Sequence, residues 1–322
     1  MARPDWLKQV VGAGREFHAL KQDPVRHNAR NLATMGLLVC LVGGLVFLAP
    51  TVPWPVVLFA GSFLFGILYF ALFILVVHEA SHDMFILHPD RQKQKRCNRF
   101  FGRLFAAPFF TNYDQHWEVG HTTHHVKPCT EEDPQEDDPE TGRALLRTVL
   151  ILVSVPGAVL FMNPSNQYGP NPWLMVRGVL TLVLGSVLVS VFWSVPAGFA
   201  LFGGLQGLLL LTRLKRTQEH GAGLAHEPDF VMRSRTYLYT LAPLTSPLNI
   251  NYHFEHHANF NVPWYLLPAY HQRLLEIVPK PLQAYIFHDR YLDQAAGRFE
   301  AIPDDLRAEF GLESLGAAQA AK

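Results

Sequence analysis

Nine of the 16 histidines in this 322-residue chain fall into four short clusters with the spacing of metal ligands. Residues three or four apart lie on one face of a helix, so their imidazoles can converge on an ion. Neutral imidazole binds zinc, copper, iron and nickel. Nine ligands are too many for one ion, and we therefore predict a pair of metals. The predicted ligands are His78, His82, His121, His124, His125, His220, His253, His256 and His257.

Adjacent histidines such as His124 and His125 differ by about 100° around a helix, so they can serve two neighbouring ions. His220 stands alone in its cluster and is predicted as a ligand rather than as a capping histidine. Each of three glutamates beside these ligands could orient an imidazole N–H group. The three are Glu79, Glu219 and Glu255. Of the histidines outside the clusters, only His116 is considered as a neighbour of the metal ligands. The others are expected at the protein surface or at a membrane interface, and they are His18, His27, His88, His226, His271 and His288.

Two long uncharged stretches must position these clusters. No Asp, Glu, Lys or Arg occurs from Asn31 to Val77 or from Gly178 to Thr212. A helix needs about 20 apolar residues to cross a bilayer, so the first stretch is long enough for two helices and the second is about long enough for two. Hydrophobic residues make up 49% of the chain and charged residues 17%. The formal net charge is zero, which gives no electrostatic reason to expect nucleic acid as a partner.

The charges that flank the apolar stretches predict the topology. Basic residues before residue 31 and from Arg91 to Arg103 place both segments on the cytoplasmic side. Helices at about 32–50 and 54–77 would cross the membrane, and so would helices at about 173–193 and 196–213. The stretch Leu145–Met162 is predicted as an interfacial or re-entrant helix, because Pro156 and Gly157 interrupt it. Four crossings then bring every histidine cluster to the cytoplasmic side.

We therefore predict an all-α integral membrane protein that forms a single domain over residues 1–322. It would contain four transmembrane helices, interfacial helices and a cytoplasmic, histidine-rich cap that binds metal. Its segments would be a cytoplasmic N-terminal segment (1–31), a helical hairpin (32–77), a region with the first two histidine sets (78–172), a second hairpin (173–213), a cytoplasmic region with His220 and the last set (214–303) and a tail (304–322). Cys97–Asn112 is predicted as an amphipathic interfacial helix, and the acidic run Glu131–Glu140 as a solvated loop.

The pattern resembles the membrane fatty acid desaturase family. The matching pieces are HEASH, HTTHH, the stretch that ends in Glu219-His220-Gly221, and PLNINYHFEHH followed by VPWYLLP. The resemblance runs from about Asn31 to Arg273 and covers order, spacing and placement. It implies two irons held by the nine histidines above, with dioxygen as co-substrate. It also implies an O2-dependent oxidation of a fatty acyl chain, either lipid-linked or free, with desaturation favoured over hydroxylation or another oxidation. Some relatives add an asparagine, but neither Asn249 nor Asn251 matches firmly.

Electrons would come from a separate protein, because the three cysteines cannot supply a four-cysteine cluster. A ferredoxin, a rubredoxin or a protein of the cytochrome b5 type is expected. The main alternative from another class is an intramembrane zinc metalloprotease, since His78-Glu79-Ala80-Ser81-His82 also fits HExxH. That enzyme would need a further ligand, typically an acid from another span, and would leave seven clustered histidines unexplained. A membrane metal carrier is the remaining alternative, although carriers usually place their ligands at mid-membrane depth.

Overall fold

The computed structural model describes residues 3–135, 141–155, 157–158, 172–221, 223–298 and 301–314. These residues are mostly helical, and they form two compact units. The first unit comprises 1–22, 123–146 and 213–322, and the second comprises 23–122 and 147–212. The predicted interfacial stretch 145–162 lies partly outside the described residues, but its first part is a helix, α8 (Gly142–Ser154).

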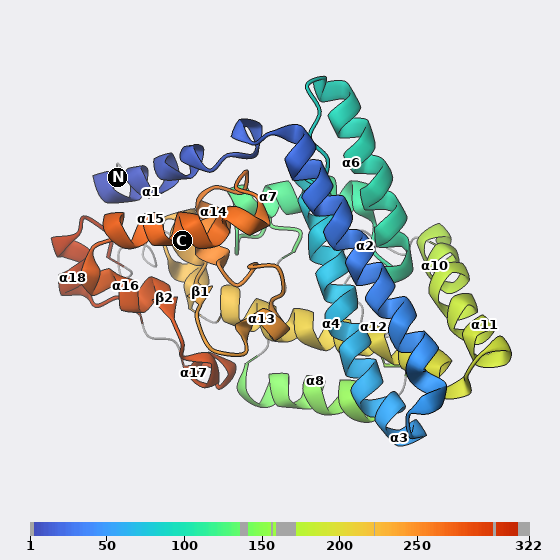
Figure 1. Ribbon diagram of the computed structural model, residues 1–322. Helices are drawn as coiled ribbons and strands as arrows, with labels where there is room; N and C mark the ends of the chain where they lie inside the picture. The colour runs from blue at the N-terminus through green and yellow to red at the C-terminus, as the bar shows by residue number, and fades with distance from the viewer. Residues whose placement is uncertain are drawn as a thin grey trace. The chain divides into compact units, whose positions relative to one another are not determined.

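The second unit contains the long apolar helices. Three are long and apolar enough to cross a membrane: Pro24–Thr51, Trp54–Ser81 and Val195–Glu219. A fourth apolar helix, Val176–Phe192, has the predicted position but is shorter than these three. In Figure 1, α2 (Pro24–Leu48) runs beside α4 (Ser62–Leu72), with which it is in contact. The helix of the first span begins eight residues before the predicted 32, because Asp23 caps it by accepting a hydrogen bond from the backbone N–H of Arg26 (2.8 Å).

Small residues allow α4 to pack closely against α12 (Val195–Glu219). A Cβ atom on Gly66 would lie 2.8 Å from the backbone of Gly207, and one on Gly204 would meet Phe65 and Tyr69 at 2.7 Å. Close approach of backbones through small residues is the usual way that apolar helices associate in a bilayer. The spans that carry the histidine clusters at their ends are therefore held together by backbone proximity.

The second unit is completed by shorter helical segments. The remaining helices are α3 (Trp54–Val56), η4 (Val57–Gly61), η5 (Phe73–His78), α5 (Glu79–Ser81), α6 (Arg91–Ala106), η6 (Ala107–Phe109), η7 (Tyr113–His121), α10 (Pro172–Gly178), η9 (Val179–Val183) and α11 (Leu184–Phe192). The segments η4, η5, η7 and η9 are π-helical. The amphipathic helix predicted at 97–112 is α6, which begins six residues earlier because Asp90 accepts hydrogen bonds from the N–H groups of Gln92 and Lys93.

The first unit has its own apolar core. Leu7 and Val10 of α1 (Asp5–Ala13) are fully buried in it, together with Leu274 of α15 (Leu267–Ile277). The hydroxyl of Tyr270 donates to the carbonyl of Val10 (2.6 Å) and fixes the two helices against each other. The other elements are η1 (Gly14–Glu16), η2 (Ala19–Lys21), η10 (Leu224–His226), η11 (Phe230–Arg233), α13 (Ala242–Thr245), α14 (His253–Ala258), η12 (Trp264–Leu266), α16 (Lys280–Ile286), α17 (Tyr291–Ala295) and α18 (Asp304–Glu309).

The described residues are mostly helical, as predicted, but they also include two short β-strands. Two short strands, β1 (Thr236–Tyr237) and β2 (Phe287–His288), pair in parallel within the first unit. The backbone N–H of Tyr237 in β1 also donates to the carbonyl of Asn251 (3.0 Å), which lies two residues before α14. The strands therefore anchor the segment that carries the last histidine set.

Candidate metal centre

Four buried histidines of the first unit form a group that could hold a metal ion. His124 comes from α7 (Thr122–Val126), His220 follows the end of α12, and His253 and His257 lie one turn apart on α14. One ligand nitrogen of each lies within 4.8 Å of those of the others. The ring centroids of His253 and His257 are 4.5 Å apart, as the i, i+4 spacing predicts.

Neighbouring groups set which nitrogen of each ring faces inward. The Nδ1–H of His124 donates to Asp133 Oδ2 (2.8 Å), and that of His220 donates to the carbonyl of Arg233 (2.9 Å). Glu219 Oε1 lies 3.2 Å from Nδ1 of His253. Burial raises the pKa of Glu219 to about 7, and its ionised form favours a proton on this Nδ1. A proton on Nδ1 leaves the lone pair on Nε2, which is the arrangement of a metal-bound histidine.

The resulting donor set fits a cation. The Nε2 atoms of His220 and His253 are 2.9 Å apart. If both carry their protons on Nδ1, two lone pairs face each other at that distance, and a positive ion between them removes the repulsion. Burial, the largest cause, lowers the pKa of both His220 and His253 well below the usual value. Both imidazoles are therefore neutral, which is the form that binds metal.

Asp133 is the functional residue that the sequence interpretation missed. It lies in the acidic run predicted as a solvated loop, yet its side chain is buried. Besides His124, its carboxylate accepts hydrogen bonds from the backbone N–H groups of Cys129 (3.0 Å) and Gln135 (2.9 Å). Burial acts to raise the pKa of Asp133, but these hydrogen bonds outweigh it and hold the pKa below its ordinary value. The only signal in the sequence was an acid eight residues after HTTHH.

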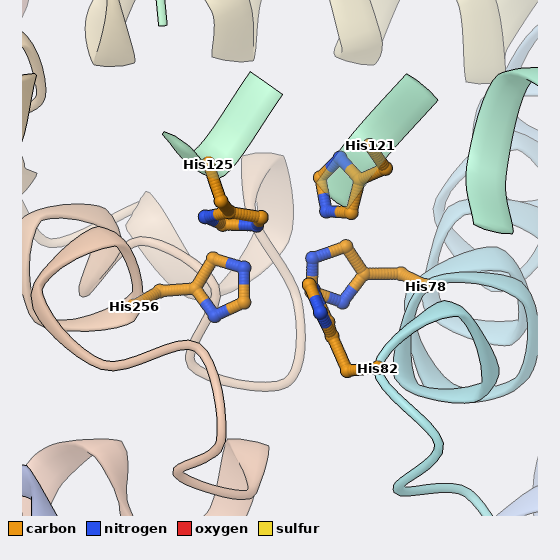
Figure 2. A group of neighbouring side chains, drawn as sticks. All are labelled: His78, His82, His121, His125 and His256. Carbon is orange, nitrogen blue, oxygen red and sulfur yellow. The ribbon is translucent and has the colours of Figure 1, made fainter. Parts of the chain in front are cut away.

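A group of three buried histidines belongs to the second unit. His78 ends the π-helical η5, His121 ends the π-helical η7, and His82 follows α5. Their ring centroids are 4.8–4.9 Å apart in all three pairs. Figure 2 shows the three imidazoles turned toward one another. π-helical turns are rare in proteins and occur frequently at functional sites. Trp117 packs against His121, with ring centroids 5.1 Å apart.

The remaining two ligand candidates are a pair within the first unit. The ring centroids of His125 and His256 are 4.4 Å apart, and both residues are drawn in Figure 2. Each is adjacent in sequence to a member of the four-histidine group, His124 or His257. Neither His125 nor His256 belongs to that group, so of each adjacent pair only one histidine does. That adjacent histidines serve different ions stays a prediction.

The three glutamates beside the ligands differ in what they contact. Glu219 lies beside His253, as described, and also forms an ion pair with Lys215. Glu79 Oε1 is 3.5 Å from Nδ1 of His78, which makes it a weaker candidate. Glu255 instead accepts hydrogen bonds from His271 (2.6 Å) and from the hydroxyl of Thr236, so the structure gives it a different partner from the one hypothesised.

Two histidines expected at a surface or interface are buried in the protein instead. Nε2 of His27 is 2.6 Å from the carbonyl oxygen of Met84, and His271 is held by Glu255. In each, one ring nitrogen has a partner well separated in sequence, which no local pattern reveals. The amides of Asn249 and Asn251 donate to the carbonyls of Trp264 and Tyr237, respectively.

Comparison with known proteins gives one finding that decides the family. The model of the fatty acid desaturase family matches residues 52–289, which is well over half of the chain. The chain belongs to the fatty acid desaturase family. The resemblance predicted from the histidine motifs is thereby confirmed. The search of curated proteins finds no match.

Family membership and the histidine groups together fit a di-iron oxidoreductase, and the three long apolar helices agree with a membrane protein. The zinc metalloprotease fits less well. Among the described residues, neither candidate metal group includes an Asp or Glu, whereas that enzyme was expected to need an acid. Glu79, which would be the catalytic base of HExxH in that enzyme, is buried and lies beside Nδ1 of His78.

Proposed function

We propose that this protein is an O2-dependent fatty acyl desaturase with two irons bound by all nine clustered histidines. One iron would be held by the four-histidine group of the first unit. The predicted ligands outside that group would hold the other iron. The observation that carries the proposal is the four-histidine group with its inward-facing nitrogens, in a chain of the desaturase family.

The ligand chemistry is compatible with iron and disfavours hard cations, and family membership favours iron among the remaining metals. Imidazole suits iron, zinc, copper and nickel, whereas calcium and magnesium prefer oxygen. When bound, such an iron pair supplies the oxidising chemistry that removes hydrogen from an unactivated C–H bond. The residues of this chain supply neutral nitrogen ligands and fixed ring tautomers. They also supply a water-poor environment, because all nine histidines are buried.

An acyl chain is the proposed substrate, reached from the membrane. We place the N-terminus and the histidines on the cytoplasmic side of four spans, with Val176–Phe192 as the third. Apolar side chains of the second unit, such as Phe73 packed on Trp117 (4.7 Å between ring centroids), could line the path of the chain toward the centre. Electrons would be delivered by a separate ferredoxin, rubredoxin or protein of the cytochrome b5 type.

Metal and product analysis of the full-length protein tests the proposal. The chain is expressed in a bacterial host together with a ferredoxin and its reductase, beside the variant His257→Ala. His226→Ala, at an exposed position, is the matched control. We expect two irons per chain and acyl chains that lack two hydrogens, with product lost only in His257→Ala. Acyl chains that gain an oxygen would make the protein a hydroxylase, and one zinc with no lipid product would refute both.

A further inference from the structure

A groove lined by four arginines lies on the second unit, and none of the nine clustered histidines lines it. It has a volume of about 610 Å³ and runs between α6 and the segment formed by α10 and η9. Arg96, Arg99 and Arg103 come from α6, and Arg177 comes from α10. The rest of its wall is mainly apolar, with Phe100 61% exposed and Leu104 54% exposed.

Close packing at one end sets the position of this groove. Gly178 lies against the ring of Phe110, where a Cβ atom would approach Cδ1 to 2.3 Å. This contact brings the start of η9 against the segment that follows α6. On α6 itself, the buried face is formed by polar and small residues such as Asn98 and Gly102. Two large apolar side chains of α6, Phe100 and Leu104, are instead exposed, which is the reverse of a helix in a soluble protein.

The arginines are only partly neutralised. Arg99 pairs with Glu118 (2.8 Å) and Arg103 with Asp114 (2.9 Å). Among the residues that the structure describes, no carboxylate pairs with Arg96 or Arg177. Two guanidinium groups therefore face the groove with their charges uncompensated, next to exposed apolar surface.

We propose that this groove binds an anionic phospholipid, with its phosphate on Arg96 and Arg177 and an acyl chain over Phe100 and Leu104. Guanidinium binds phosphate oxygens with two parallel hydrogen bonds. Arg177 lies at the start of the apolar helix Val176–Phe192, at the level where a lipid headgroup would meet the protein. A free phosphate would leave the apolar wall uncovered, and an acidic protein surface would not use exposed Phe100 and Leu104. The proposal does not depend on the metal chemistry.

Lipid titration of the purified full-length protein in detergent tests this site. Phosphatidylglycerol and phosphatidylcholine with identical acyl chains are compared, with inorganic phosphate as competitor. The test variant is Arg96→Gln/Arg177→Gln. The control, Arg91→Gln/Lys93→Gln, removes the same charge from exposed positions of α6 outside the groove.

We expect phosphatidylglycerol to bind more tightly than phosphatidylcholine. Each lost arginine should weaken phosphatidylglycerol binding roughly fivefold, while the control changes it by less than about twofold because solvent and salt screen distant charges. Iron content should be the same in both variants. Equal affinity for the two lipids, an equal loss in the control, or full competition by inorganic phosphate would overturn the proposal. So would loss of binding to an acidic ferredoxin with lipid binding intact.

Discussion

Replacing Asp133 by asparagine should release iron from the four-histidine group. Three donors converge on this buried carboxylate: Nδ1–H of His124 and the backbone N–H groups of Cys129 and Gln135. An asparagine offers one acceptor oxygen and an NH2 group, so at least one donor must face another donor. A buried donor without a partner costs about 1–3 kcal/mol. The negative charge that stabilises the Nδ1–H form of His124 is lost as well.

The expected consequence is iron affinity lower by about 10–100-fold, the usual cost of losing the partner of a metal-bound histidine. The assay is iron per chain in the full-length protein after equilibration with graded concentrations of a chelator. Glu132→Gln is the matched control, because it removes a carboxylate one residue away whose side chain is 69% exposed and paired with Lys127. If Asp133→Asn kept both irons at the chelator concentration that leaves Glu132→Gln loaded, the orienting role of Asp133 would be wrong.

Three further outcomes are expected. Gly66→Ala should destabilise the protein by about 1–3 kcal/mol in a thermal unfolding experiment, since its Cβ would lie 2.8 Å from the backbone of Gly207; Gly43→Ala, with open space around it, should cost almost nothing, and equal effects would contradict the close helix packing. His220→Ala should retain one iron per chain in elemental analysis, whereas complete retention or complete loss would argue against two separate ions. Burial, with the charges of Arg235 and Arg290, lowers the pKa of His288 from 6.5 to about 4. As the pH falls, the unfolded chain therefore takes up this proton before the folded chain does. The free energy of unfolding should decrease by about 3 kcal/mol between about pH 6.5 and about pH 4. His288→Gln should flatten that part of the plot of unfolding free energy against pH, and an unchanged plot would count against this role of His288.

The histidine groups were largely predictable because helical periodicity is a local property. The i, i+4 spacing placed His253 and His257 on one face, and the 100° step separated His256 from His257, with no knowledge of the fold required. The long uncharged stretches likewise predicted long apolar helices, because the length needed to cross a bilayer is fixed by its thickness, and three of these helices are long and apolar enough to cross. The predicted start of the first helix was late because Asp23 is a cap, and caps lie outside the apolar run.

The features that could not be predicted depend on contacts between residues distant in sequence. Asp133 is one of seven acidic residues in Glu131–Glu140, and only the fold of its loop directs its carboxylate toward His124. His271 and Glu255 were assigned separate roles, yet they bind each other across 16 residues. Nothing in the sequence near His27 indicated that the carbonyl of Met84 would be its partner. Such pairs satisfy buried polar groups, and their choice is settled by tertiary packing rather than by local pattern.

The first unit is assembled from three separated stretches, and this has a consequence for biosynthesis. His124 leaves the ribosome well before His220, and the apolar helices Val176–Phe192 and Val195–Glu219 are made between them. At that stage one imidazole is present where four are needed, and a single neutral ligand holds iron weakly. If the proposed function is right, iron would be acquired only after His257 has been made, when the preceding apolar helices would already be in the bilayer. Maturation of the newly made chain would then depend on iron reaching it at the membrane surface.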